Sequence, residues 1–193
     1  MSNISLIIGL GNPGKEYAQT RHNAGFWFVE QLADRYGITL NADPKFHGYS
    51  GRGQIEGHDT RLLLPTTFMN RSGQSVVPFA KFYQISTEAI LIAHDELDMN
   101  PGVIRLKSGG GHGGHNGLRD IVPHIGANFH RLRIGIGHPG SKEQVSGHVL
   151  GKAPSSEQAL MDAAIEYALS KTKMLVQGQV SQAMNQINAY KPA

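Results

Sequence analysis

Short apolar segments recur along the chain at intervals of a few tens of residues. Residues 4–10, 59–64, 89–93 and 103–106 have the length and the largely apolar character of strands that lie buried in a sheet. Residues 131–137 alternate basic with apolar side chains, which predicts a strand with one exposed face. The hydrophobic pattern therefore predicts five strands.

Longer segments carry apolar residues at the spacing of three to four that is typical of a helix. The segment 23–36 is followed by Gly37, which suits the left-handed residue that ends many helices. The segment 155–171 begins at Ser155, a residue type that caps helix N-termini. Further helices are predicted at 72–83, at 118–124 and from about 174 to 187.

Strands and helices alternate along the chain, without an internal repeat or a linker. This order predicts a single α/β domain over residues 1–193 with a largely parallel or mixed sheet. Segments 48–53 and 108–117 are rich in glycine and predict a turn and a loop. Residues 138–152 lack periodicity and predict a mobile surface segment. The stretch 138–154 is equally compatible with a lid over a site and with a disordered loop.

Length and composition narrow the class of protein. A chain of 193 residues with 39% apolar and 17% charged residues suits one large folded domain. No stretch reaches the roughly 18 uninterrupted apolar residues of a membrane span, and the N-terminus predicts a buried strand rather than a secretion signal. The sequence contains no cysteine, which excludes disulfides, thiolate zinc sites and cysteine nucleophiles. We therefore expect a cytoplasmic protein that does not bind membranes.

Charge is distributed unevenly along the chain. The net charge is only +3, but residues 101–152 contain seven basic and two acidic side chains, and six of the ten histidines. The remainder of the chain is therefore slightly acidic. A basic segment of this kind fits a polyanionic partner such as a nucleic acid, and it fits a solvated basic surface equally well.

The segment Gly9-Leu-Gly11-Asn-Pro-Gly14 matches the G-x-G-x-x-G pattern of dinucleotide-binding proteins. In that fold a helix opens within the motif so that its N-terminus can hold a pyrophosphate. Pro13 disfavours helical geometry at the preceding Asn12, and the helical pattern begins only at residue 23. We therefore expect the glycines to form a tight turn that directs Asn12 outward.

The motifs of two common kinds of catalytic site are missing, which argues against those sites. The chain has neither the G-x-S-x-G elbow of many serine hydrolases nor the H-E-x-x-H motif of zinc proteases. His112 and His115 are the one close histidine pair. They fit the beginning of a metal site, but loop histidines that form hydrogen bonds or face solvent are the favoured interpretation.

Polar clusters follow several of the apolar segments. They are Asn12, Arg21-His22-Asn23, Phe68-Met69-Asn70, His94-Asp95-Glu96 and His115-Asn116-Gly117. Ligands of open α/β sheets bind at the carboxyl ends of the strands. Each cluster alone fits a cap or a turn, and Asn23 would cap the first helix well. Together they predict a site.

Five segments of the chain closely resemble bacterial peptidyl-tRNA hydrolase. They are GLGNPGKEYAQTRHNAGF, TFMNRSGQSV, IAHDELD, GGGHGGHNGLR and FHRLRIGIGHPG, and the similarity extends in order from about residue 4 to residue 150. The resemblance implies a monomeric esterase without metal or cofactor, with a mixed twisted sheet between helices. Its substrate would be peptidyl-tRNA, cleaved at the ester between the peptide and the 3′ ribose, so that tRNA returns to translation.

The resemblance also implies roles for individual residues. His22 would accept the proton of a water molecule, Asp95 would stabilise the useful state of His22, and Asn12 would distinguish blocked from free aminoacyl-tRNA. The matching substrate-binding positions are Tyr17, Phe68, Met69, Asn70 and Asn116, and the basic positions expected to meet phosphates are Arg105, Lys107 and Arg133. Many relatives have lysine in place of Arg105, which keeps the charge but changes the hydrogen-bond geometry.

These residue types suit ester hydrolysis at neutral pH. A histidine with a pKa of about 6.5 can accept a proton from water, and a carboxylate on its second ring nitrogen fixes the tautomer and stabilises the imidazolium. Asparagine side chains offer donors and acceptors without charge. The alternative is a tRNA- or ribosome-binding module of the same fold without catalytic activity, which would need only the basic segment.

Overall fold

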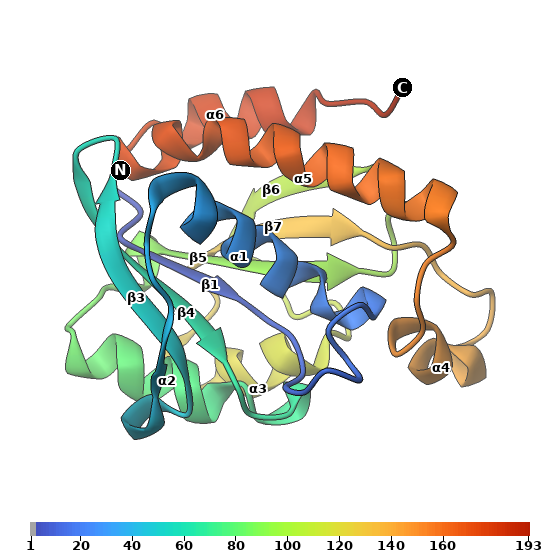
Figure 1. The fold of residues 1–193 in the computed structure, drawn as a ribbon, viewed down its shortest axis with the longest axis horizontal. Helices are drawn as coiled ribbons and strands as arrows, with labels where there is room; N and C mark the ends of the chain where they lie inside the picture. Colours follow the sequence, from blue (N-terminus) through green and yellow to red (C-terminus); the bar gives the residue numbers. More distant parts are fainter. Residues whose placement is uncertain (1–2) are drawn as a thin grey trace.

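The computed structural model describes residues 3–193 (Figure 1). Its strands are β1 (Leu6–Gly9), β2 (Asn41–Asp43), β3 (Gly48–Ile55), β4 (His58–Pro65), β5 (Ile90–Glu96), β6 (Ile104–Ser108) and β7 (His130–Gly135). Its α-helices are α1 (Ala24–Tyr36), α2 (Gly73–Phe82), α3 (Asn116–Ile125), α4 (Val145–Val149), α5 (Ser155–Val176) and α6 (Val180–Asn188). Within residues 3–193, no helix combines the length and the apolar character that crossing a membrane requires.

The seven strands of the described residues form one sheet in the order β2-β3-β4-β1-β5-β7-β6. The four central strands β4, β1, β5 and β7 run parallel, whereas β2, β3 and β6 join the edges in antiparallel pairs. Ile7 on β1 pairs with Leu62 on one side and Leu91 on the other. The predicted α/β class with a mixed, largely parallel sheet is therefore confirmed.

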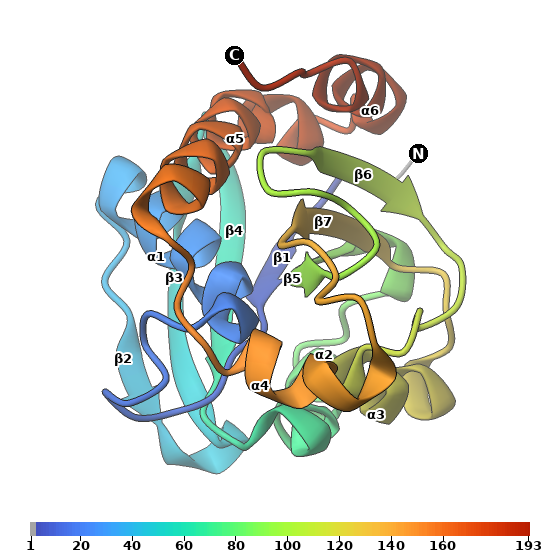
Figure 2. The same cartoon turned by 90° about the vertical axis from the view of Figure 1, so that its right-hand side faces the viewer.

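Helices cover both faces of the sheet, as expected (Figures 1 and 2). Helices α1, α5 and α6 pack on one face through a core that includes Ile7, Leu91 and Leu132. Helices α2 and α3 cover the other face through a second core around Ile8 and Ile92. Adjacent residues of one strand enter different cores because successive side chains point to opposite faces of a sheet. Burial on both faces explains the nearly continuous apolar runs of β1 and β5.

The predicted helices are present, but some of their ends differ. Gly37 ends α1 in the left-handed conformation, with φ of 64°, as expected. The residue that precedes α5 is Pro154, and no side-chain cap bond forms there, so the expected capping role of Ser155 is wrong. The helix predicted from residue 174 begins only at Val180, because residues 174–176 complete α5.

Three segments differ from the sequence prediction in their structure. The turn predicted at 48–53 belongs to strand β3, where Gly51 and Gly53 allow Ile38 to pack closely against the backbone. Strand β7 is almost wholly buried rather than half-exposed, because the Arg131 guanidinium donates to the carbonyl oxygens of Gly109 and Gly111. Residues 138–152 are not irregular throughout, since they include α4.

Candidate active site

A cleft of about 620 Å³ lies beyond the carboxyl ends of β1, β4 and β5. Its lining includes members of the polar clusters predicted from the sequence, namely Asn12, His22, Phe68, Met69, Asn70, Asp95, Glu96, His115 and Asn116. Residues more than 100 positions apart in the chain meet here because the parallel strands end at the same edge of the sheet. The prediction that these clusters form one site is supported by their convergence.

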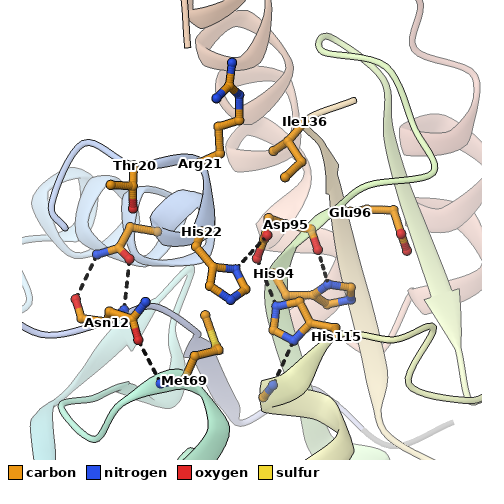
Figure 3. Close-up of polar contacts among 12 residues, drawn as sticks. Asn12, Thr20, Arg21, His22, Met69, His94, Asp95, Glu96, His115 and Ile136 are labelled. Carbon is orange, nitrogen blue, oxygen red and sulfur yellow. Dashed lines mark hydrogen bonds and ion pairs between the residues drawn. The ribbon is translucent and has the colours of Figure 1, made fainter. Parts of the chain in front are cut away.

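His22 and Asp95 form a hydrogen-bonded pair in the cleft (Figure 3). His22 lies in a short 3₁₀ turn, Arg21–Asn23, that leads into α1, and Asp95 lies near the end of β5. The Nδ1 atom of His22 is 2.8 Å from Oδ2 of the buried carboxylate. If Asp95 is ionised, it can only accept, so Nδ1 carries the proton and Nε2 keeps its lone pair. Within residues 3–193, Nε2 has no hydrogen-bond partner.

His115 occupies the second oxygen of the same carboxylate. Its Nε2 donates to Oδ1 of Asp95 at 2.9 Å, while its Nδ1 accepts from the backbone N–H groups of Gly117 and Leu118 at the start of α3. The two backbone donors require a lone pair on Nδ1, so the tautomer of His115 is fixed with its proton on Nε2. The sequence prediction treated His115 as a loop histidine and missed this contact; its position before a helix was the available signal.

Asn12 is held by hydrogen bonds on three sides. Its side-chain Oδ1 accepts from the backbone N–H of Met69 at 2.8 Å, and its own backbone N–H and carbonyl bond the side chain of Asn23 at 2.9 and 3.0 Å. Asn12 is therefore buried at the cleft wall, and the expected outward orientation is wrong. Asn23 occupies the N-cap position of α1 as predicted, but its side chain forms no cap hydrogen bond because its amide group is engaged with Asn12.

The glycines before Asn12 serve close packing rather than a tight turn. A side chain at Gly9 would collide with the backbone of Gly25 on α1, and one at Gly11 would collide with the ring of Phe26. Only Gly14 of this motif has a positive φ, of 106°. The motif thus lets the start of α1 approach the end of β1, which sets Asn12 and His22 on neighbouring walls of the cleft.

Comparisons with known proteins agree with this geometry. A sequence model described as peptidyl-tRNA hydrolase matches residues 6–193. The chain belongs to the peptidyl-tRNA hydrolase family. A curated peptidyl-tRNA hydrolase from Acinetobacter baumannii is 88% identical over 193 residues and is covered completely, as is this chain. One from Psychrobacter cryohalolentis is 63% identical over 97% of both chains.

The structural comparison extends this similarity to three dimensions. The crystal structure of peptidyl-tRNA hydrolase from Acinetobacter baumannii superposes with a TM-score of 0.99 and 88% identity, over 100% of this chain and 98% of that chain. The recognised family, the fold class and the activity expected from the sequence are therefore confirmed. The chain is a hydrolase, and its substrate is peptidyl-tRNA.

In this peptidyl-tRNA hydrolase, His22 and Asp95 form the central pair of the cleft. Opposing effects set the protonation of this pair. Burial lowers the pKa of His22, but the charge and hydrogen bond of Asp95 outweigh burial and raise the pKa above its ordinary value of 6.5. Burial would raise the pKa of Asp95, but contact with His22 and His115 holds it well below its usual range. Asp95 is therefore ionised at neutral pH, and His22 keeps a proton to higher pH than an ordinary histidine does.

His94, beside Asp95 in the chain, is fully buried behind the pair. Its Nδ1 donates to the backbone carbonyl of Asp95 at 2.8 Å, and its ring lies edge-on to His115 with centroids 4.9 Å apart. Its Nε2 is buried without a hydrogen-bond partner among the described residues. Burial, with a smaller contribution from His115, lowers the pKa of His94 to about 3. His94 is thus neutral in the folded protein.

The buried His94 predicts how stability depends on pH. Between pH 6.5 and about 3, the unfolded chain binds a proton at residue 94 and the folded chain does not, so acid favours unfolding. Urea unfolding over this range should show that His94→Gln loses stability less steeply than the parent, by up to about 1.4 kcal/mol per pH unit. The exposed His124 offers a control, because His124→Gln should keep the parent's slope. Parallel curves for His94→Gln and the parent would contradict the prediction.

The predicted substrate-binding residues divide into two groups. Tyr17, Phe68, Met69, Asn70 and Asn116 line the cleft, and the rings of Tyr17 and Phe68 meet edge to face at 6.3 Å. Phe68 is 57% exposed, so its ring is open to contact with a ligand in the cleft. Arg119 and Lys142 also line the cleft but were not among the predicted residues.

The predicted basic residues lie outside the cleft, on the two strands at one edge of the sheet. Arg105 on β6 is paired in register with Arg133 on β7, and Lys107 lies two residues further along β6. Arg133 forms an ion pair with Glu96 at 3.0 Å, directly beside Asp95 in the chain. The basic edge therefore begins next to the central pair and extends away from it.

The segment 138–154 forms part of the cleft wall. Val145 and Val149 of α4 line the cleft, and Arg21 donates to the backbone carbonyl of His148 at 2.9 Å. His148 in turn donates from Nε2 to the carbonyl of Ile136 at 3.1 Å. Movement of this segment as a lid stays a prediction.

His22, Asp95 and His115 also form a group that could hold a metal ion. One ligand atom from each lies within 4.8 Å of the others. Both histidines already donate hydrogen bonds to Asp95, so a metal ion bound by Asp95 would compete with these bonds. The expectation of hydrolysis without a metal or cofactor stays a prediction.

Proposed function

We propose that His22 is the general base with which this peptidyl-tRNA hydrolase activates water. The observation that carries the proposal is the bond from Nδ1 of His22 to Asp95, which leaves Nε2 free in the cleft. Water between Nε2 and the ester carbon would transfer a proton to Nε2 as its oxygen attacks. The proton then passes to the departing 3′ oxygen of the ribose, which leaves free tRNA and a peptide carboxylic acid; the acid releases its own proton to solvent and becomes a carboxylate.

Uncharged donors around the cleft suit the oxygen that becomes negative during attack. The Oδ1 atom of Asn12 is occupied by Met69, so its Nδ2 is the atom left to donate. Asn70 and Asn116 line the same cleft. We propose that these amides stabilise the oxyanion and hold the peptide's carbonyl groups, which needs no metal ion.

The basic edge supports a tRNA interface formed by Arg105, Lys107 and Arg133. Contacts with phosphates position a nucleic acid and release bound cations, so affinity falls as salt rises. We expect Arg133→Ala to reduce the slope of log affinity against log salt by about 0.7–0.9 in tRNA-binding titrations. Arg52 on β3, which is ion-paired with Asp59 on β4, gives a matched control. An unchanged slope for Arg133→Ala would remove Arg133 from the interface.

We also propose that the enzyme works as a monomer in the cytoplasm. Its substrate is made during translation, and the cleft contains the proposed base, carboxylate and amides within one chain. Sedimentation of the purified protein at micromolar concentration tests the oligomeric state, and a stable dimer would contradict the proposal.

The pH dependence of tRNA release tests the proposed mechanism. The parent protein is incubated with N-acetyl-aminoacyl-tRNA at a series of pH values, and released tRNA is measured. We expect kcat/KM to fall in acid with the slope of one proton and a midpoint above 6.5, because His22 must be neutral to act and Asp95 raises its pKa. A rate that stays constant through this range would exclude His22 as the base. If the parent protein binds this tRNA but releases none of it from its aminoacyl group, the alternative of a non-catalytic tRNA-binding module is favoured.

A further inference from the structure

A second groove adjoins the cleft. It encloses about 940 Å³ between the start of α1, the β2–β3 hairpin, the segment after β4 and the start of α2. Asn12 and Phe68 line both hollows, so they form the boundary between them. A ligand that leaves the cleft past Asn12 and Phe68 therefore enters the second groove.

The sheet order places this groove opposite the basic edge. The central pair lies at the ends of β1 and β5, β7 and β6 follow on one side, and β4, β3 and β2 follow on the other (Figure 2). The substrate has two arms that diverge from the ester, the tRNA and the peptide. If the tRNA lies on the β7–β6 side, the peptide extends toward the β4–β3–β2 side, where the second groove lies.

The side chains of the groove suit a peptide better than a phosphate backbone. Glu30 and Asp43 are acidic and oppose Arg71, so the groove lacks the positive charge that phosphates need. Phe26 and Tyr49 provide apolar surface, and Tyr49 is 45% exposed. The cleft itself has Arg119 and Lys142. Asp95 and Glu96 balance these two basic residues, so charge changes from balanced in the cleft to slightly acidic in the second groove.

Hydrogen-bonding groups are also available along one wall of the groove. Thr66, Thr67 and Gln74 line this wall, and Oγ1 of Thr67 is buried without a hydrogen-bond partner among residues 3–193. An extended peptide presents carbonyl and N–H groups at regular intervals, and its side chains alternate in direction. Apolar surface facing polar groups is the combination that binds such a chain without selecting one sequence.

We infer that this second groove binds the peptide of peptidyl-tRNA beyond the residue whose ester is cleaved. The inference rests on the proposed function, because it takes the ester to lie at His22 and the tRNA to lie on the basic edge. By this inference, the groove is occupied only when the tRNA carries a peptide of several residues. An N-acetyl-aminoacyl group ends near Asn12 and does not reach the groove.

Filling the groove should therefore affect long and short substrates differently. Gln74 is exposed at the start of α2 and lines the groove, so Gln74→Trp would obstruct it without entering the core. Two substrates are compared, pentapeptidyl-tRNA and N-acetyl-aminoacyl-tRNA, with the same tRNA and the same esterified residue. We expect kcat/KM to fall about fivefold or more for the long substrate and to stay within about twofold for the short one.

Gln54→Trp is the matched control, because Gln54 is also exposed, on β3, but does not line the groove. It should leave both substrates unchanged. Ala42→Trp, on the opposite wall of the groove, should reproduce the effect of Gln74→Trp. An equal fall on both substrates, or no fall on the pentapeptidyl substrate with either groove variant, overturns the inference. A parent protein that releases tRNA from neither substrate instead overturns the proposed mechanism.

Discussion

Replacing His22 with alanine is expected to lower kcat for peptidyl-tRNA by about 10²–10⁴-fold, the usual contribution of a general base. The variant loses the one cleft histidine whose free ring nitrogen faces the space where water would attack. His115 cannot replace it, because both of its ring nitrogens are already engaged. Single-turnover release of tRNA measures the effect on the chemical step.

Two controls distinguish loss of the catalytic base from loss of folding or of tRNA binding. The exposed His124 gives the matched variant His124→Ala, which should retain the parent's rate. Binding of tRNA to His22→Ala should persist, because the basic residues on β6 and β7 are distant in sequence and unaltered. A His22→Ala protein that binds tRNA and hydrolyses as fast as the parent would show that the base lies elsewhere.

Asp95→Asn is expected to lower kcat by about 10³–10⁴-fold, because the substitution forces His22 into the tautomer that cannot accept a proton from water. Both histidines donate to Asp95, whereas an asparagine offers one oxygen and one NH₂ group. His115 is fixed as a donor by Gly117 and Leu118, so the new oxygen must face His115. The NH₂ group then faces His22, which has to accept at Nδ1 and carry its proton on Nε2.

This argument separates a tautomer effect from a loss of charge. In the double variant Asp95→Asn/His115→Ala, the amide can turn its oxygen toward His22, and part of the lost rate should return. The acid limb of the pH–rate profile of this double variant should lie at lower pH than in the parent, because the Asp95 charge that raises the pKa of His22 is gone. Asp98→Asn, at an exposed position nearby, controls for the change of residue type. A double variant slower than Asp95→Asn would contradict the tautomer argument.

The fold and the location of the site at one edge of the sheet could be predicted, because both depend on local sequence patterns. Apolar runs without exposed faces predict buried strands, and parallel strands bring their following residues to one edge. Asn12, His22 and Asp95 therefore converge as expected. The family resemblance, rather than the pattern, singled out His22 among ten histidines.

The details that failed depend on contacts between distant segments. The bond between His115 and Asp95 requires the glycine-rich loop to turn back on itself through residues with positive φ, including Gly113 and Gly114. The orientation of Asn12 depends on a backbone donor of Met69, 57 residues away. Local hydrophobic spacing carries no information on either contact, nor on which edge strand receives the basic residues.

The buried guanidinium of Arg131 has a consequence for how the loop 109–115 behaves. Glycines that permit its left-handed turns would also permit many other shapes, and that freedom would extend to His115. Arg131 is only 2% exposed, and it ties the carbonyls of Gly109, Gly111 and Ala127 to the sheet. The entropy of ordering the loop is thus lost when the chain folds rather than when substrate arrives. His115 meets each tRNA already aligned on Asp95.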